Sequence, residues 1–105
     1  MESRMLIVSS MYNVEEWIER TIKSVTAQNY KNYKYILVDD ISTDKTVEHA
    51  HHLTRDLEHI TVLTNTEKKY SLKNIYEGIK ALNPSPEDII ITLDGDDWLA
   101  NPNVF

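Results

Sequence analysis

The sequence contains no cysteine and only 2 glycines among its 105 residues. The absence of cysteine excludes a disulfide framework, thiolate zinc sites and a cysteine nucleophile. The two glycines cannot form a Walker or dinucleotide-binding phosphate loop, and the segment Ser10-Met11-Tyr12-Asn13, where such a loop would lie, contains none. A phosphate ligand would therefore have to be held by other means.

Long apolar runs and basic clusters are also missing. No stretch approaches the roughly 18 to 20 continuous apolar residues of a membrane-spanning helix. Met1-Glu2-Ser3-Arg4 leads straight into a short apolar run without a cleavable signal region. We therefore expect a cytoplasmic location, with any membrane association provided by segments outside this sequence. The formal net charge of -6, without a stripe of Lys or Arg, excludes a nucleic-acid partner, whose binding depends on phosphate neutralisation.

Short apolar segments rich in β-branched residues alternate with segments of helical period. The apolar segments are 5–9, 35–38, 60–63 and 89–93, and we expect strands buried on both faces of a parallel sheet. Helices are predicted over 14–25, about 44–57 and 72–82, with Asn13, Asp44 and Ser71 as N-cap residues and Asn83-Pro84 ending the third. The order predicts an α/β fold, a Rossmann-like open and mainly parallel sheet with flanking helices, in one domain over residues 1–105.

Carboxylates follow two of the predicted strands. Asp39 and Asp40 come after the second strand, and Asp94, Asp96 and Asp97 come after the fourth. Ligands of open α/β sheets bind at this carboxyl edge. Like charges this close repel one another unless they are protonated or bind a cation, and oxygen-only ligands favour Mg²⁺ or Mn²⁺. A metal would supply the positive charge that the protein lacks. Turn formation is the alternative role for Asp-Gly and Asp-Asp pairs.

Two other groups of residues have structural alternatives. Tyr12 could stack on a base or pack, and composition alone favours packing. His49 and His51 point about 200° apart on a helix, so we expect these side chains, with His52, on a solvated face instead of in a zinc site.

Taken in order, these residues resemble the family 2 glycosyltransferases of the GT-A fold. The Val-Asp-Asp-x-Ser-Thr-Asp element, joined to a later Asp-x-Asp-Asp, is specific as a pair. The matching text is Tyr12-Asn13, Glu15, Ser24-Val25, Gln28, Tyr30, the run 38–46 and Leu93-Asp94-Gly95-Asp96-Asp97. The resemblance implies the nucleotide-sugar-binding part of an enzyme that transfers a sugar to an acceptor hydroxyl with inversion, using Mn²⁺ or Mg²⁺.

The resemblance also implies a nucleotide site. Asp40 would accept a hydrogen bond from the uracil imide, which favours a UDP-sugar, and Asp39 would support its loop or the ribose. Lys73 lies where the family often has an Arg facing the diphosphate, although a solvated helix lysine is the alternative. The full set of implied nucleotide-binding residues is Ser10, Tyr12, Asp39, Asp40, Lys73 and Asp94.

The implied metal residues are Asp96 and Asp97. Asp96 would bind the ion that bridges the diphosphate, and Asp97 would be a neighbouring ligand or would support one. Asp94 would face the ribose or a metal-bound water. The general base is not identified and is expected beyond Phe105, in an acceptor-binding half that this sequence lacks. The acceptor, whether glycan, protein or lipid, is undefined.

Three positions depart from the family pattern. The family has Pro in place of Ser10 and Gly in place of Ile41, and an Asn-x-Gly turn where this chain has Asn65-Thr66-Glu67 in a segment about one residue longer. A β-branched residue disfavours positive φ, so we expect the turn at Ile41 to have a different shape. Trp98 and Leu99 would pack under the absent half, so we expect exposed apolar surface and self-association of the isolated chain.

Other functions remain open at this point. A non-catalytic nucleotide-sugar-binding or interaction module fits the same residues. A nucleotidyltransferase is disfavoured because it usually carries a glycine-rich loop after the first strand. A phosphatase or a receiver domain would carry its acidic residues there as well.

Overall fold

The computed structural model describes residues 3–105, so Met1 and Glu2, which begin the stretch without a signal region, lie outside the described residues. The elements follow one another as β1 (Met5–Met11), α1 (Ile18–Thr26), β2 (Tyr33–Asp39), α2 (Thr46–Thr54), β3 (Ile60–Thr64), α3 (Tyr70–Leu82) and β4 (Ile89–Thr92). The predicted alternation of strands and helices is confirmed. Across residues 3–105, no helix has the length and apolar character needed to cross a membrane.

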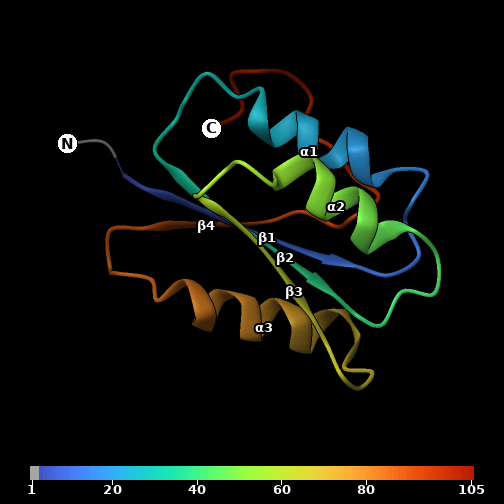
Figure 1. Cartoon of the computed structure of the whole chain (residues 1–105). Helices are drawn as coiled ribbons and strands as arrows, with labels where there is room; N and C mark the ends of the chain where they lie inside the picture. Colours follow the sequence, from blue (N-terminus) through green and yellow to red (C-terminus); the bar gives the residue numbers. More distant parts are fainter. Residues whose placement is uncertain (1–2) are drawn as a thin grey trace.

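The four strands form one parallel sheet in the order β3-β2-β1-β4. Helices α1 and α2 cover one face and α3 covers the other (Figure 1). The chain adds β2 and β3 on one side of β1, and α3 then carries it back to place β4 on the other side. The strand order therefore reverses at β1, and ligands of open α/β sheets bind beyond the carboxyl end of such a strand.

The core lies on both faces of the two central strands. Ile7, Leu37 and Tyr35 pack with buried side chains of α1 on one face, and Val8 and Ile36 pack against α3 on the other. Gly78 lets α3 approach the sheet closely, since a Cβ there would lie 2.7 Å from Val8 Cγ1.

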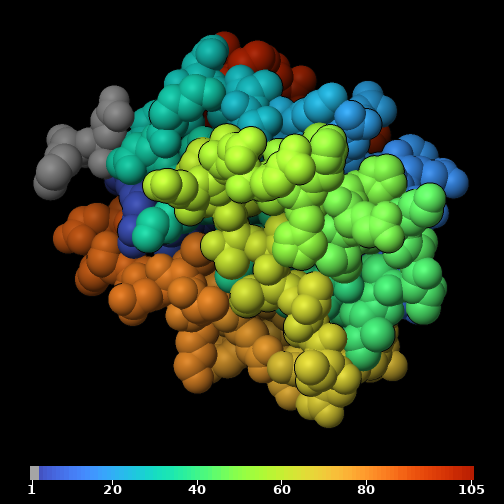
Figure 2. Space-filling view, viewed as in Figure 1, coloured from blue at the N-terminus to red at the C-terminus, as the bar shows by residue number. Residues whose placement is uncertain are grey.

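The two edge strands are less buried than the sequence predicts. The expectation of burial on both faces is right for β1 and β2, but in β4 the side chains of Ile89 and Ile90 are 46% and 42% exposed. Atoms of β3 reach the surface between α2 and α3 (Figure 2). A continuous apolar run thus occurs in edge strands as well as in central strands, so the run alone does not show which position a strand takes in the sheet.

None of the three predicted residues occupies the N-cap position of its helix, which is Trp17 in α1, Lys45 in α2 and Lys69 in α3. Helix α1 begins at Ile18, after Trp17, and Asn13 instead accepts a hydrogen bond from the backbone N–H of Thr43 at 2.8 Å. Helix α3 begins at Tyr70, so Ser71 lies inside it. Helix α2 begins after Lys45 and ends at Thr54, short of Leu57. Asp44 still accepts a hydrogen bond from the N–H of Thr46 at 3.0 Å.

The C-terminal segment runs beside α1, where Figure 1 shows it in red. The buried amide of Gln28 donates to the Asn101 carbonyl at 2.7 Å and accepts from the N–H of Val104 at 3.0 Å. Leu99 is half-buried against the core, so less of it is exposed than expected. Trp98 is 43% exposed as expected, with the Arg20 guanidinium 3.8 Å from its ring centroid.

Candidate functional site

A cavity of about 270 Å³ lies at the carboxyl edge of the sheet, around the end of β1 where the strand order reverses. It brings together residues that are up to 86 positions apart in the sequence, from the ends of β1, β2 and β4 and the start of α3. Its lining is Ser10, Tyr12, Val14, Asp40, Lys68, Tyr70, Ser71, Asp94, Gly95 and Asp96. Five of the predicted site residues therefore face one cavity.

At the end of β1, Ser10 and Tyr12 differ in their surroundings. The hydroxyl of Ser10 accepts a hydrogen bond from the amide of buried Asn74 at 3.0 Å. Tyr12 is 47% exposed, and the ammonium nitrogen of Lys68 lies 3.1 Å from its ring centroid. The packing role that composition favours for Tyr12 is therefore wrong, because one face of its ring meets a cation at the cavity.

At the end of β2, Asp39 is buried and organises the following loop. Its Oδ2 accepts from the N–H of Ser42 at 2.9 Å, and its Oδ1 accepts from the Ser42 hydroxyl at 2.5 Å. Asp39 thus supports this loop, and its contact with a ribose stays a prediction.

Asp40 is also buried, and each of its carboxylate oxygens has two donors. Oδ1 accepts from the Asn65 amide at 3.0 Å and the Lys69 N–H at 2.8 Å. Oδ2 accepts from the Tyr70 N–H at 2.8 Å and lies 3.3 Å from the Lys68 ammonium. Burial acts to raise the pKa of Asp40, but these hydrogen bonds outweigh it and lower the pKa to about 2. A base N–H that bonds to Asp40 must therefore replace one of four donors.

The loop after Asp40 contains a strained residue. Ile41 has φ 64°, in the left-handed region that β-branched residues disfavour. Ile41 therefore adopts the positive φ that its β-branched side chain was expected to disfavour. The hydrogen bond from Ser42 to Asp39 spans Ile41, and the bond from Thr43 to Asn13 fixes the loop just after it, so together they impose its conformation.

After β4, the carboxylates of Asp94, Asp96 and Asp97 form an exposed group. Each offers one oxygen, and the three oxygens lie within 4.8 Å of one another. Within residues 3–105, no hydrogen bond or ion pair occupies these carboxylates. Three convergent carboxylates suit a hard cation such as Mg²⁺ or Mn²⁺, so the residues fit the metal that the sequence implies.

The backbone of this acidic loop is anchored to its surroundings. The buried Thr21 hydroxyl lies 2.8 Å from the Gly95 carbonyl oxygen and 2.6 Å from that of Asp97. The Gly95 N–H donates to the Ser10 carbonyl at 3.0 Å. A Cβ at Gly95 would lie 2.8 Å from Met11 Cβ, so the loop needs a glycine to pass this close to β1.

Two lysines near the start of α3, Lys68 and Lys73, differ in whether they line the cavity. Lys73 is exposed on α3 and is not among the residues that line the cavity, so its contact with a diphosphate stays a prediction. Lys68 lines the cavity, and the sequence analysis missed it. The unusual length of the segment after Asn65 was a signal of a changed site there, but only the fold shows which side chain enters.

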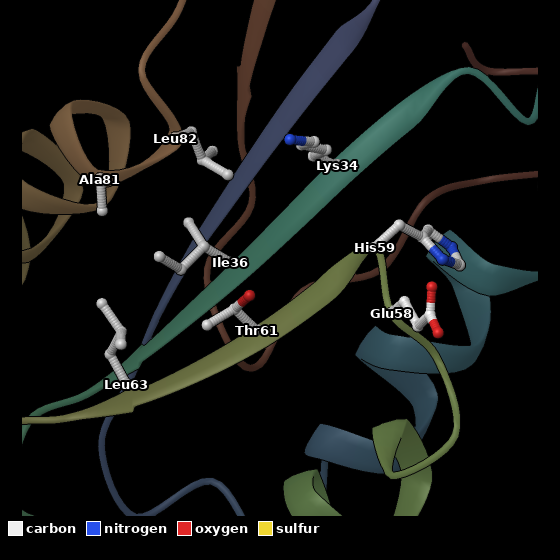
Figure 3. Close-up of a pocket in the computed structure, with 8 residues that line it drawn as sticks. All are labelled: Lys34, Ile36, Glu58, His59, Thr61, Leu63, Ala81 and Leu82. Carbon is white, nitrogen blue, oxygen red and sulfur yellow. The ribbon is translucent and has the colours of Figure 1, made fainter.

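A second cavity, of about 340 Å³, lies on the α3 side of the sheet. Ile36, Leu63 and Leu82 form its apolar part, and His59 and Glu58 lie to one side (Figure 3). It contains none of the predicted site residues and no convergent carboxylates. The cavity at the carboxyl edge is therefore the candidate site.

Comparisons by sequence identify relatives of the chain. The model of the family described as Glycosyl transferase family 2 matches residues 6–104. EpsE of Bacillus subtilis (strain 168), which is named as a glycosyltransferase, is 33% identical over 95 residues, covering 87% of this chain and 32% of that protein. A glycosyltransferase of Haemophilus influenzae (strain ATCC 51907 / DSM 11121 / KW20 / Rd) is 33% identical over 97 residues, covering 90% and 37%. The chain thus spans about a third of the length of these curated relatives.

Solved structures share the fold. The mannosyltransferase PcManGT of Pyrobaculum calidifontis, in complex with GDP-Man and Mn²⁺, superposes with a TM-score of 0.84 at 18% identity, covering 97% of this chain and 30% of that one. TarS of S. aureus (residues 1–349), in complex with UDP, has a TM-score of 0.78 at 19% identity, covering 95% and 29%. The open parallel sheet is therefore that of GT-A glycosyltransferases. Because the family model covers nearly the whole chain, and both acidic segments of the resemblance border one cavity, the chain belongs to glycosyl transferase family 2.

Proposed function

We propose that this chain is the donor-binding part of a glycosyltransferase, which binds a nucleotide sugar at the carboxyl edge of its sheet with Mn²⁺ or Mg²⁺. The observation that carries the proposal is the convergence of three carboxylate oxygens within 4.8 Å beside a cavity lined by Tyr12 and Asp40. A chain with net charge -6 repels a free diphosphate, and a cation on this group removes that repulsion. PcManGT with GDP-Man and Mn²⁺ is a structural neighbour in support.

The dimensions of the site fit an extended nucleotide. Asp40 follows β2 and Asp94 follows β4, the two strands that flank β1. Adjacent strands lie roughly 4.8 Å apart, so the two ends of the cavity are separated by roughly 10 Å. The base would lie against Tyr12 near Asp40, and the diphosphate would lie near Asp94, Asp96 and Asp97.

The residues of the acidic loop and those that anchor it each have a proposed role in the transfer. Asp96 and Asp97 would hold the metal, and Asp94 would face the ribose or a metal-bound water. The bound metal supplies positive charge at the diphosphate, where negative charge develops as the bond to the sugar breaks. Thr21 and Gly95 fix the backbone that presents the carboxylates, which keeps the leaving group in place.

The finer assignments are UDP as the nucleotide and inversion at the sugar. A uracil imide N–H matches the acceptor Asp40, and the pyrimidine ring would stack on the exposed ring of Tyr12. In an inverting transfer the acceptor hydroxyl attacks from the side opposite the diphosphate, assisted by a general base. We propose that this base lies outside the described residues, in the part of the protein that the longer relatives also contain.

Thermal unfolding tests the donor site. The chain is unfolded alone, with Mn²⁺, with UDP, and with both, and the series is repeated with GDP in place of UDP. A ligand at about 100 times its dissociation constant adds about 2.7 kcal/mol to the free energy of unfolding. For a domain of this size each kcal/mol raises the midpoint by roughly 4 to 8 °C. We expect a shift only when nucleotide and metal are present together, larger for UDP than for GDP.

Two variants control this experiment. Asp96→Asn removes a proposed metal ligand and should abolish the shift, whereas Asp56→Asn removes an exposed carboxylate just after α2, distant in sequence from the site, and should keep it. No shift with any nucleotide and metal would refute the proposal. A larger shift with GDP would refute only the assignment of UDP.

A further inference from the structure

The Lys68 side chain contacts three residues at one end of the cavity, and its weaker contacts are with the Asp40 backbone carbonyl at 3.5 Å and with the Tyr70 ring, whose centroid lies 5.4 Å from the ammonium nitrogen. Its ammonium nitrogen lies 3.1 Å from the Tyr12 ring centroid and 3.3 Å from Asp40 Oδ2. The side chain is 33% exposed, whereas that of Asp40 is 3% exposed. Among the described residues that line the cavity, Lys68 is the one with a cationic side chain.

This lysine lies at the end of the cavity away from the acidic group. It contacts Tyr12 and Asp40, which follow β1 and β2, whereas Asp94 and Asp96 follow β4 at the far side of β1. A diphosphate beside the acidic group places its nucleobase at the Lys68 end. The ammonium therefore occupies space that a base would need, instead of space at the diphosphate.

The two closest contacts of Lys68, with the Tyr12 ring and with Asp40 Oδ2, are ones that a base would use. A base stacked on Tyr12 needs the ring face that the ammonium covers, and a base N–H that bonds to Asp40 needs the oxygen beside it. The other donors to Asp40 are fixed, since two are backbone N–H groups and the Asn65 amide also donates to Asn74 at 2.7 Å. Lys68 is the donor on a flexible and partly solvated stem, and its departure leaves Asp40 with three hydrogen bonds.

We propose that Lys68 is a specificity-determining residue of the nucleobase end, an occupant that an incoming base displaces from Tyr12 and Asp40. The proposal rests on the proposed function, that the cavity binds a nucleotide. Lys68 admits a ligand whose base replaces both contacts, by stacking on Tyr12 and donating an N–H to Asp40. A cation–π contact and a partly exposed ion pair are each weak, so their removal should tighten nucleotide binding about three- to tenfold.

Lys68→Met tests this proposal. Comparing its binding of UDP with its binding of pyrophosphate distinguishes an effect on the base from an effect on the diphosphate. Dissociation constants of UDP and of pyrophosphate, each with Mn²⁺, are measured by isothermal titration calorimetry for the unaltered chain and the variant. Displacement predicts that the variant binds UDP about three- to tenfold more tightly and binds pyrophosphate unchanged, since pyrophosphate has no base. Lys80→Met, on the exposed last turn of α3, removes the same charge outside the cavity and should change neither constant.

Other outcomes overturn the proposal in distinguishable ways. Weaker binding of both UDP and pyrophosphate by Lys68→Met would make Lys68 a ligand of the diphosphate. An unchanged constant for UDP, with binding still dependent on Mn²⁺, would overturn the displacement alone. If neither compound binds either protein, the proposed function fails, and the role of Lys68 fails with it. A melting midpoint for the variant within a few degrees of the unaltered chain checks that the fold is intact.

Discussion

The carboxylate of Asp40 binds the backbone N–H of Tyr70, with Oδ2 and the nitrogen 2.8 Å apart. This bond joins the end of β2 to the first turn of α3, and a second bond from the Lys69 N–H strengthens the same connection. An anion at a helix N-terminus satisfies donors that have no partner within the helix and interacts favourably with the helix dipole. Asp40 is therefore a structural residue of the site as well as a candidate base acceptor.

We expect Asp40→Asn to destabilise the chain. An amide can accept fewer hydrogen bonds than a carboxylate, and its NH₂ group would face one of the donors of α3. Hydrogen bonds to a charged group contribute about 1.5 to 3 kcal/mol each, so we expect a loss of about 2 kcal/mol in the free energy of unfolding. Urea unfolding measures this loss. An unchanged midpoint would show that Asp40 does not hold α3.

Stability should fall at acid pH because several carboxyls have depressed pKa values, those of Asp40 and Asp88 most strongly. The Arg4 side chain and the Ser85 N–H lower the pKa of Asp88 to about 2, and the donors around Asp40 lower its pKa to about 2, in both cases from 3.8. A carboxyl with a depressed pKa contributes stability that is fully present above its unfolded value. That contribution should be lost as the pH falls from about 4 to about 2.

Unfolding midpoints between pH 2 and 6 check this pH dependence. Asp88→Asn should flatten the profile in part, because Asn cannot change its charge and the pair with Arg4 at 2.7 Å is lost at every pH. A variant profile as steep as that of the unaltered chain would assign the acid sensitivity to other groups.

Ile41→Gly should stabilise the chain. The left-handed conformation at φ 64° costs a non-glycine residue roughly 1 to 2 kcal/mol. Glycine avoids this cost but gives back roughly 0.5 to 1 kcal/mol through the greater freedom of the unfolded chain. We expect a net gain of roughly 0.5 to 1 kcal/mol in thermal unfolding. Asn83→Gly, at φ 51°, is the matched control and should gain less, since Asn tolerates this conformation. Equal gains would argue against special strain at Ile41.

Thr21→Val should weaken metal binding as well as stability. Loss of the hydroxyl leaves the carbonyls of Gly95 and Asp97 without their buried donor, which costs about 1 to 3 kcal/mol and loosens the acidic loop. Mn²⁺ affinity is measured in the presence of UDP by the relaxation of water protons, since we expect the metal to bind together with the nucleotide. Thr54→Val removes a buried hydroxyl that bonds only within α2, so it should lower stability without changing Mn²⁺ affinity. The same Mn²⁺ affinity in both variants would contradict the anchoring role of Thr21.

The edge of β4 should mediate self-association of the isolated chain. Ile89 and Ile90 are exposed on this strand, and within residues 3–105 its outer edge pairs with no other strand. Exposed apolar edges readily pair with other chains. Sedimentation velocity should show association that Ile90→Lys reduces and that Leu72→Lys, on the exposed face of α3, does not. A monomer at high concentration would refute this prediction.

The sequence predicts the fold and the acidic loop well because both depend on local patterns. The apolar runs of β1 and β2, and the position of Asp94, Asp96 and Asp97 directly after the last strand, can be recognised without any tertiary information. The failures depend on contacts between distant segments. Asp40 binds the start of α3 from 30 residues away, and local patterns assign that role to Ser71. Lys68 enters the cavity because α3 folds back beside β1, which no neighbouring residue indicates.

The most direct test of the donor site is isothermal titration calorimetry of UDP into the chain, with Mn²⁺ and again with excess EDTA. The account predicts saturable binding with Mn²⁺, at least tenfold weaker binding with EDTA, and an equally weak affinity for Asp96→Asn even when Mn²⁺ is present. Equal affinity with Mn²⁺ and with EDTA, or unchanged binding by Asp96→Asn, would contradict the claim that Asp94, Asp96 and Asp97 hold the nucleotide through a metal ion.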